Sequence, residues 1–307
     1  MNSNTISLKS VSKHYPSHQA VTDVNLSVPE GCLMALVGHN GAGKTTLMKL
    51  ILGLIKPTSG SLSILGRNPA DQNNFRYRDR IGFLPENVAF EANMTGRELI
   101  HFYADLKQEN KKRSLELLEM VGLADAMDRR YKTYSKGMKQ RLGLAQALLG
   151  KPRMLLLDEP TSGLDPAARR HFYDIIRDLR KDGVTILLCS HVLTELEAQT
   201  DAVTVMNSGR VVATGSLNDL REQAGLPLSM RITVREGLSE KIATPLRNQN
   251  AVITHLNGRH LELECDPDAK MQLLRYLGEL GSVIEDVELF NSSLDQLYAV
   301  FSDRRGA

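Results

Sequence analysis

The chain has 307 residues, of which 42% are hydrophobic and 24% charged, with a formal net charge of +2. This length predicts two domains, the composition is that of a soluble globular protein, and the small net charge gives no whole-chain argument for nucleic acid. No apolar run is long enough to span a bilayer, 1–5 do not read as a signal peptide, and three scattered cysteines favour a cytoplasmic protein with free thiols.

Two strands are expected first, at 5–11 and 21–28, where apolar and polar residues alternate. Tyr15 lies between them, and an aromatic residue at this place can stack on an adenine ring. A half-buried loop tyrosine is an equally weighted interpretation. The apolar run 33–37 predicts a third strand.

A glycine-rich loop follows that strand and precedes a helical run that stops at Gly53. The loop reads G-H-N-G-A-G-K-T-T. The order of strand, loop and helix is the context that a phosphate-binding P-loop requires, and it makes an ordinary glycine-rich turn the weaker interpretation. Lys44 is expected to reach the β- and γ-phosphates, Thr45 to ligate Mg²⁺ and Thr46 to donate to the α-phosphate. Backbone N–H groups and the helix N-terminus complete the site. The predicted nucleotide-binding residues are Gly38, His39, Asn40, Gly41, Ala42, Gly43, Lys44, Thr45 and Thr46.

The next segments predict a strand at 61–65, a polar surface loop at 68–80 and a short strand at 81–84. Residues 87–150 then read as a helical insertion. Its first helix begins with a capping box, Thr95 to Glu98, a second covers about 111–121, and a third has Ser135 as its N-cap.

Buried parallel strands are expected again at 154–157 and 184–189, and a hairpin at 202–213. Asp165 and Pro166 open the helix between the two strands as N-cap and first residue. Strands alternating with helices predict an α/β fold with a mixed, largely parallel sheet and an antiparallel edge.

A small C-terminal α+β domain is expected at 226–307, after a helix that ends at Gly225. From 228 the pattern reads as three strands, a helix, a strand and a helix. Asn257 and Gly258 predict a type I′ turn between the second and third strands. This part of the sequence carries no catalytic or metal-ligating constellation.

Residues after the buried strands extend the phosphate site. Asp158 fits the acidic residue that holds Mg²⁺, and Glu159 is placed to polarise a water for attack on the γ-phosphate. A lone histidine at the end of a strand usually has a structural role. The place of His191 beside a P-loop core instead favours contact with the γ-phosphate. Ser135 and Gly137 lie at the start of a helix, where N–H groups can bind an anion. These residues either bind the nucleotide of a second copy of the chain or only cap the helix.

The order of these motifs resembles the ATP-binding subunit of an ABC transporter over about 5–225. The motifs are the P-loop, 85–86, 134–138, 156–160, 162–165 and 190–191. The resemblance implies an ATPase domain at 1–225 with a helical subdomain at about 87–150, and ATP and Mg²⁺ as cofactors. It assigns Tyr15 to adenine stacking, Asp165 to the loop that couples two subunits and His191 to the switch histidine. It assigns the signature motif to Tyr134, Ser135, Lys136, Gly137 and Met138.

The same resemblance implies a head-to-tail homodimer with two ATP molecules between P-loop and signature, bound to an integral membrane permease at the inner face of the cell membrane. Two departures are visible. The signature differs from L-S-G-G-Q at Tyr134, Lys136 and Met138, as in ABC-2 type exporters. Glu86 stands where the family has glutamine; a carboxylate still ligates Mg²⁺ but adds charge to an anionic site.

A narrower resemblance rests on His39 and on the stretches 84–88, 132–138 and 189–193. Together they resemble the ATPases of transporters that serve maturation of the copper enzyme nitrous oxide reductase, with a permease and a periplasmic protein as partners. Copper or sulfur chemistry would belong to those partners. The alternatives are the ATPase of another ABC-2 exporter, for a drug, polysaccharide or lipid, and a non-transport ABC ATPase acting on DNA or ribosomes. No long coiled coil, second ATPase domain or basic stripe supports nucleic acid.

Overall fold

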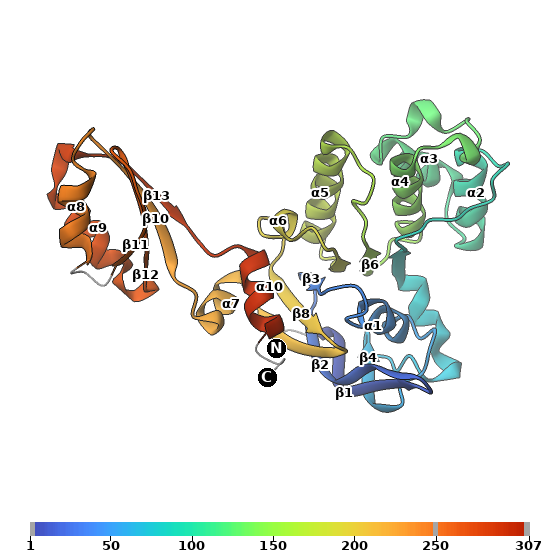
Figure 1. Ribbon diagram of the computed structural model, residues 1–307. Helices are drawn as coiled ribbons and strands as arrows, with labels where there is room; N and C mark the ends of the chain where they lie inside the picture. The colour runs from blue at the N-terminus through green and yellow to red at the C-terminus, as the bar shows by residue number, and fades with distance from the viewer. Residues whose placement is uncertain (1–3, 248–250, 304–307) are drawn as a thin grey trace. The chain divides into compact units, whose positions relative to one another are not determined.

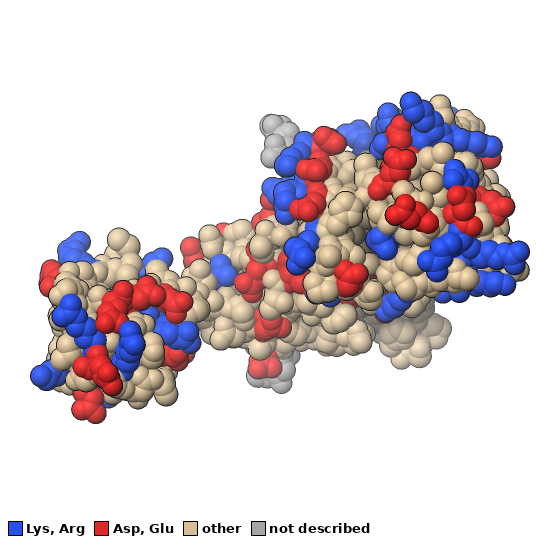
Figure 2. All heavy atoms as spheres, turned by 90° about the horizontal axis from the view of Figure 1, so that it is seen from above, with Lys and Arg blue, Asp and Glu red and all other residues tan. Residues whose placement is uncertain are grey.

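The computed structural model describes residues 4–247 and 251–303. Of the N-terminal segment 1–5, which does not read as a signal peptide, residues 1–3 lie outside the described part. The chain divides into two compact units, Met1–Leu217 and Asn218–Ala307 (Figure 1). This division lies before residue 225, where the sequence predicts the end of the ATPase domain. The domain boundary at 225 stays a prediction. On the face seen in Figure 2, acidic and basic side chains are intermingled over both units.

A six-stranded sheet of order β5-β6-β7-β3-β8-β9 forms the centre of the first unit. All neighbouring strands in it are parallel except for the edge pair β8–β9. Every residue of β3, β6 and β7 is buried, as expected of apolar strands covered on both faces. The predicted mixed, largely parallel sheet is therefore confirmed. The strands are β3 (Leu33–Val37), β5 (Ile81–Leu84), β6 (Met154–Asp158), β7 (Thr185–Cys189), β8 (Ala202–Asn207) and β9 (Arg210–Gly215).

A second, antiparallel sheet has the order β2-β1-β4. Its strands are β1 (Asn4–Tyr15), β2 (His18–Pro29) and β4 (Ser59–Ile64). Helix α1 (Lys44–Ile51) packs in a core that this sheet shares with the central one, with Ile6, Leu47 and Leu187 in the same cluster. The loop expected at 68–80 contains a 3₁₀ helix, η1 (Gln72–Arg80), instead of irregular chain throughout.

Helices α2 (Gly96–Leu106), α3 (Lys111–Met120) and α4 (Lys136–Ala147) pack together in the region expected to be helical. The capping box is present: the Glu98 N–H donates to the Thr95 hydroxyl and the Thr95 N–H donates to the Glu98 carboxylate. Helix α5 (Pro166–Lys181) begins after its predicted N-cap, Asp165. Short helical turns complete the unit: η2 (Ala124–Ala126), η3 (Tyr131–Thr133) and α6 (Leu193–Leu196).

The second unit contains an antiparallel sheet of order β11-β12-β10-β13, with α8 and α9 on one face (Figure 1). Its core lies between that face and the two helices and includes Ile232, Leu246, Leu261 and Leu273. The elements are α7 (Leu217–Ala224), β10 (Leu228–Val234), α8 (Ser239–Arg247), β11 (Ala251–Leu256), β12 (His260–Cys265), η4 (Pro267–Ala269), α9 (Lys270–Glu279), η5 (Gly281–Val283), β13 (Ile284–Phe290) and α10 (Leu294–Asp303).

Two expectations for this unit were wrong. Helix α8 lies between the first two strands, where the sequence pattern suggested none; it contains Pro245, a residue that usually ends helices. The β11–β12 hairpin exists, but neither Asn257 nor Gly258 has the positive φ of a type I′ turn. The Asn257 side chain instead accepts hydrogen bonds from the N–H groups of Arg259 and His260 and holds a different turn.

Candidate active site

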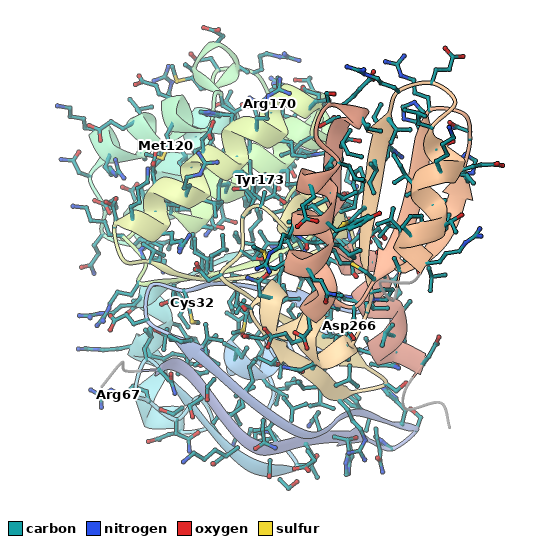
Figure 3. All side chains as sticks on the ribbon, turned by 90° about the vertical axis from the view of Figure 1, so that its left-hand side faces the viewer. Cys32, Arg67, Met120, Arg170, Tyr173 and Asp266 are labelled. Atoms are coloured by element: carbon teal, nitrogen blue, oxygen red, sulfur yellow. The ribbon has the colours of Figure 1, made fainter. Side chains whose placement is uncertain are left out.

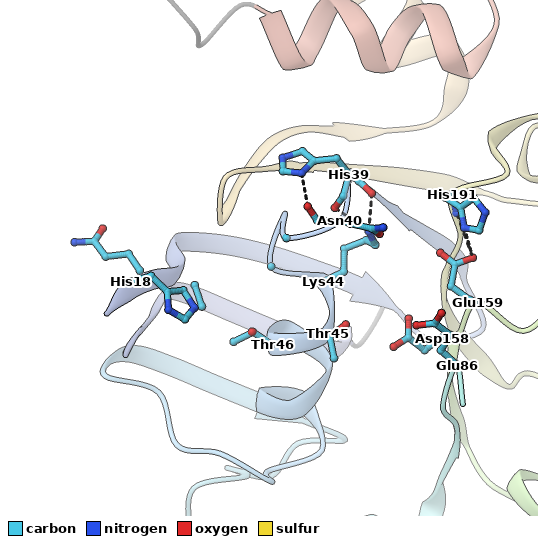
Figure 4. A pocket seen from close by; sticks show the side chains of 15 residues that line it. His18, His39, Asn40, Lys44, Thr45, Thr46, Glu86, Asp158, Glu159 and His191 are labelled. Carbon is cyan, nitrogen blue, oxygen red and sulfur yellow. Dashed lines mark hydrogen bonds and ion pairs between the residues drawn. The ribbon is translucent and has the colours of Figure 1, made fainter. Parts of the chain in front are cut away.

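Four neighbouring strands bring the predicted residues to one edge of the central sheet. The glycine-rich loop follows β3, Glu86 follows β5, Asp158 ends β6, and His191 follows β7. Because the carboxyl ends of parallel strands meet at the same edge, these residues surround a common cavity of about 470 Å³ (Figure 4). The predicted residues that line it are Gly38, His39, Asn40, Gly41, Gly43, Lys44, Thr45, Thr46, Glu86, Asp158, Glu159 and His191.

The glycine-rich loop is held in shape by its own residues. Gly43 has a φ of +103°, and a Cβ there would lie 2.6 Å from the Ala20 carbonyl oxygen, so only glycine fits. The buried Lys44 ammonium donates hydrogen bonds to the carbonyl oxygens of Gly38 at 2.5 Å and His39 at 3.2 Å. A phosphate placed in the loop would offer this ammonium a stronger, charged acceptor.

Three carboxylates occupy the wall that faces Lys44 and Thr45 (Figure 4). Asp158 is only 8% exposed. Burial first, and then the neighbouring Glu159 and Glu86 carboxylates, raise the pKa of Asp158 to about 6, although the Lys44 ammonium opposes the shift. A cation at this wall would stabilise the charged form of Asp158.

The Mg²⁺ expected here needs more than these side chains. Within the described parts of the chain, no three His, Cys, Asp or Glu residues are placed to hold a metal ion by themselves. Mg²⁺ commonly binds through one or two carboxylates and completes its coordination with water and substrate phosphates. The carboxylate wall opposite the phosphate loop fits that kind of shared site.

Glu159 has an unusual backbone and a specific partner. Its φ is +49°, in the left-handed region that non-glycine residues seldom adopt and that is concentrated at functional sites. Its carboxylate oxygen Oε2 lies 2.7 Å from Nδ1 of His191, and its side chain is 13% exposed against 68% for the histidine. The pair therefore fixes a carboxylate at the cavity wall with an accessible imidazole beside it.

Tyr15 does not line the cavity, but His18 does. The two rings are stacked, with centroids 5.2 Å apart and planes at 22°. Sequence reasoning missed His18 and its neighbours Gln19 and Ala20. A second aromatic residue shortly after Tyr15 was the available signal.

The predicted signature residues lie outside this cavity. Ser135 caps α4 and accepts a hydrogen bond from the Met138 N–H, while Lys136 Nζ donates to the Ser162 hydroxyl at 2.7 Å. Gly163 has a φ of +80°, and a Cβ there would lie 2.8 Å from Lys136 Cδ, so the lysine stem rests directly on this glycine. The predicted site residues that do not line the cavity are Tyr15, Ala42, Ser135, Lys136, Gly137, Met138 and Asp165.

A P-loop at the carboxyl edge of a parallel sheet, faced by a strand-end aspartate and an adjoining glutamate, defines a P-loop ATPase. The chain belongs to the family of ABC transporter ATP-binding proteins. The family model described as ABC transporter matches residues 21–162. The bacitracin transport ATP-binding protein BcrA of Bacillus licheniformis is 39% identical over 286 residues, which cover 92% of this chain and 88% of BcrA.

Two further similarities extend this assignment. The daunorubicin/doxorubicin resistance ATP-binding protein DrrA of Streptomyces peucetius is 32% identical over 294 residues, covering 93% of this chain and 88% of DrrA. The ATP-binding cassette MJ0796, solved as a dimer in a post-hydrolysis state with ADP and Pi, is 27% identical with a TM-score of 0.65, covering 69% of this chain and 98% of MJ0796. The protein is an ATP-binding subunit of an ABC transporter and an ATPase. No helix in the described residues is long and apolar enough to cross a membrane.

Proposed function

We propose that the chain hydrolyses ATP as the motor of an ABC-2 type transporter, and the Glu159–His191 pair beside the P-loop carries this proposal. Lys44, Thr46 and the loop N–H groups bind the phosphates. The adenine ring stacks against Tyr15, with His18 beside it. In-line attack by water then releases ADP and phosphate.

Glu159 acts as the general base and accepts the proton of the attacking water, while His191 orients this carboxylate and contacts the γ-phosphate. Thr45 and Asp158 would hold Mg²⁺, with Glu86 as a further ligand. Mg²⁺, when bound, neutralises charge on the phosphates. The three carboxylates that share this wall support a cation there, and a positive charge would also stabilise the ionised form of Asp158, which burial and the neighbouring carboxylates disfavour.

Glu159→Gln tests the base directly. It should lower turnover by about 100-fold or more, because general bases contribute roughly 10²–10⁴-fold, and ATP binding should persist. Glu279→Gln, at an exposed glutamate of α9 in the second unit, is the matched control and should hydrolyse ATP normally. Near-normal turnover by Glu159→Gln would remove the residue from this role.

Two chains paired head to tail complete each site in the proposed transporter. Ser135, Lys136, Gly137 and Met138 do not line their own chain's cavity, and the similar cassette MJ0796 was solved as a dimer. The N–H groups at the start of α4 then bind the γ-phosphate of the neighbouring chain. Asp165, the N-cap of α5, lies in the loop that couples the two sites.

A groove with several aromatic and aliphatic side chains in its lining supports docking of a membrane permease. The groove measures about 290 Å³ and lies between β5 and α4, lined by residues that include Phe83, Val88 and Phe90. Phe90 contacts Tyr103, and Tyr103 contacts Phe102, whose side chain is half exposed. Such a continuous apolar patch is typical of a protein interface. Docking to the permease would hold the chain at the cytoplasmic face of the membrane, and nucleic acid is not a proposed partner.

Maturation of nitrous oxide reductase is the proposed purpose of the transporter. The stretches around His39, Glu86, Ser135 and His191 resemble those of NosF, so the proposed partners are a NosY-like permease and, through it, a NosD-like periplasmic protein. A drug or peptide exporter is the second candidate, because the similar proteins DrrA and BcrA are named for drug resistance and bacitracin transport.

Deletion of the gene, combined with co-purification of the permease, separates the two purposes. Loss of nitrous oxide reductase activity and of its copper centre, restored by the wild-type chain and not by Glu159→Gln, would support the maturation role. Unchanged reductase activity together with new sensitivity to bacitracin or daunorubicin would replace it with the exporter.

A further inference from the structure

Four arginines surround a cavity of about 370 Å³ that has no part in the ATP site. This arginine cavity is lined by Leu65, Arg67, Arg76, Tyr77, Arg80 and Arg153. Arg67 lies at the surface of the first unit (Figure 3). Because the whole chain has a net charge of only +2, a cavity with four guanidinium groups is a local feature and does not follow from composition.

The charges in this cavity are poorly balanced. Arg153 is paired with the carboxylate of Glu30. Within residues 4–247 and 251–303, no carboxylate forms a salt bridge with Arg67, Arg76 or Arg80. Because the four arginines that line the cavity all carry positive charge, an anion bound there would be attracted by each of them.

The cavity is built from anchored backbone rather than from a single loose loop. Arg67 closes a tight turn, with backbone hydrogen bonds in both directions to Ile64 at 2.7 and 2.9 Å. The Arg153 N–H donates to the Arg80 carbonyl at 2.9 Å, which ties the starts of β6 and β5 together. The arginines on these elements are therefore carried at fixed points of the fold.

Helix η1, which carries Arg76 and Arg80, is anchored to the end of α1. Arg78 donates a hydrogen bond to the Gly53 carbonyl at 2.8 Å. Tyr77 is 5% exposed, and its hydroxyl packs against Gly53 so closely that a Cβ on this glycine would lie 2.4 Å from the hydroxyl oxygen. Tyr77 thus forms a buried aromatic part of the cavity wall.

We propose that the arginine cavity binds a phosphate-bearing anion. The planar fork of each guanidinium matches phosphate oxygens in a bidentate manner, and arginine is the residue best suited to this recognition. The cavity volume of about 370 Å³ falls within the range of small-ligand sites. The phosphate belongs either to a free polyphosphate-type anion or to the headgroup of an anionic lipid, and the site is independent of ATP hydrolysis.

Two probes distinguish these sources: inorganic tripolyphosphate, measured by calorimetry, and phosphatidylcholine vesicles with or without phosphatidylglycerol, measured by co-flotation. Both use the full chain carrying Lys44→Ala, so that the P-loop contributes little. The test variant adds Arg67→Gln and Arg76→Gln. The matched control adds Arg170→Gln and Arg275→Gln, two exposed arginines outside the cavity that remove the same charge.

Binding of either probe should weaken by about tenfold or more in the test variant, because each charge-assisted hydrogen bond contributes of the order of one tenfold step. The control should change less than about twofold, since distant exposed charges are screened by salt. Tripolyphosphate binding alone would identify a free anion, and binding to phosphatidylglycerol vesicles would identify a headgroup.

Absence of binding to both probes, or an equal loss in the control, would overturn the proposal. In a chain with an intact Lys44, the substitutions at Arg67 and Arg76 should leave ATP hydrolysis unchanged. A failure of the anion site is thereby distinguished from a failure of the ATPase.

Discussion

Asp158→Asn should stabilise the nucleotide-free protein while destroying its function. The ordinary pKa of 3.8 is raised to about 6 in the folded chain, mainly by burial and then by Glu159 and Glu86. An ionised Asp158 therefore destabilises the folded state by roughly 3 kcal/mol at pH 7.5, since one pKa unit corresponds to about 1.4 kcal/mol. Neutral asparagine removes this penalty. We expect a gain of about 2–3 kcal/mol, or about 4–10 °C in Tm.

The pH dependence gives the sharper signature. Below about pH 3 the carboxyl is protonated in both folded and unfolded chains, so the substitution should bring little gain. As the pH rises from about 3 to 7, the unfolded chain ionises first and the folded parent loses stability relative to the variant. The gain should be roughly half its full size at pH 5 and complete above pH 7.

Thermal unfolding in EDTA without nucleotide, at pH 5 and pH 7.5, measures this gain. Asp128→Asn is the control with the opposite sign, because Arg97 lowers the pKa of Asp128 and loss of that charge should not stabilise the chain. Adding ATP and Mg²⁺ should stabilise the parent more than the Asp158→Asn variant. A gain that is absent at pH 7.5, or equal at both pH values, would refute the electrostatic reasoning.

Three further predictions concern the assembled transporter. Lys44→Ala and Ser135→Arg chains should each be inactive alone. When they are mixed, both defects fall on the same site of the mixed dimer and the other site stays intact, so part of the ATPase activity should return. Normal hydrolysis by the Ser135→Arg chain alone would exclude a signature that acts in trans. Truncation after Gly225 should leave ATP binding intact and weaken ATP-driven dimerisation by light scattering, whereas unchanged dimers would remove the second unit from pairing. Glu86→Gln should keep basal turnover within several-fold and alter its stimulation by the permease; complete loss would make this carboxylate essential to the chemistry.

Local chemistry in the sequence was enough to predict much of the fold. The N-caps Thr95, Ser135 and Asp165 were found because a polar side chain before a helical run satisfies the N–H groups at the start of the helix. The apolar runs of β6 and β7 identified strands buried on both faces. Helix α8 was missed because Pro245 conflicts with a helical pattern that packing against the C-terminal sheet sustains.

Most residues that line the ATP site were predictable because parallel strands deliver their following residues to one edge. His18 was not, since it reaches the cavity through the β1–β2 hairpin, where it pairs with Tyr15. The left-handed backbone of Glu159 is likewise invisible in the sequence. The arginine cavity joins residues from three separate parts of the chain, so only the folded structure brings Arg67, Arg76 and Arg153 together.

The contact between Lys136 and Ser162 connects two parts of the chain that are proposed to serve different ATP sites. Lys136 lies at the start of α4, and Ser162 lies shortly after Glu159, so one hydrogen bond links the proposed signature helix to the segment that follows the proposed base of the same chain. Gln140 of α4 adds a hydrogen bond to the Glu159 carbonyl. In a head-to-tail pair, a rearrangement at one chain's own base would therefore displace the helix that it offers to its neighbour. Such a linkage would make the geometry of one site depend on the state of the other.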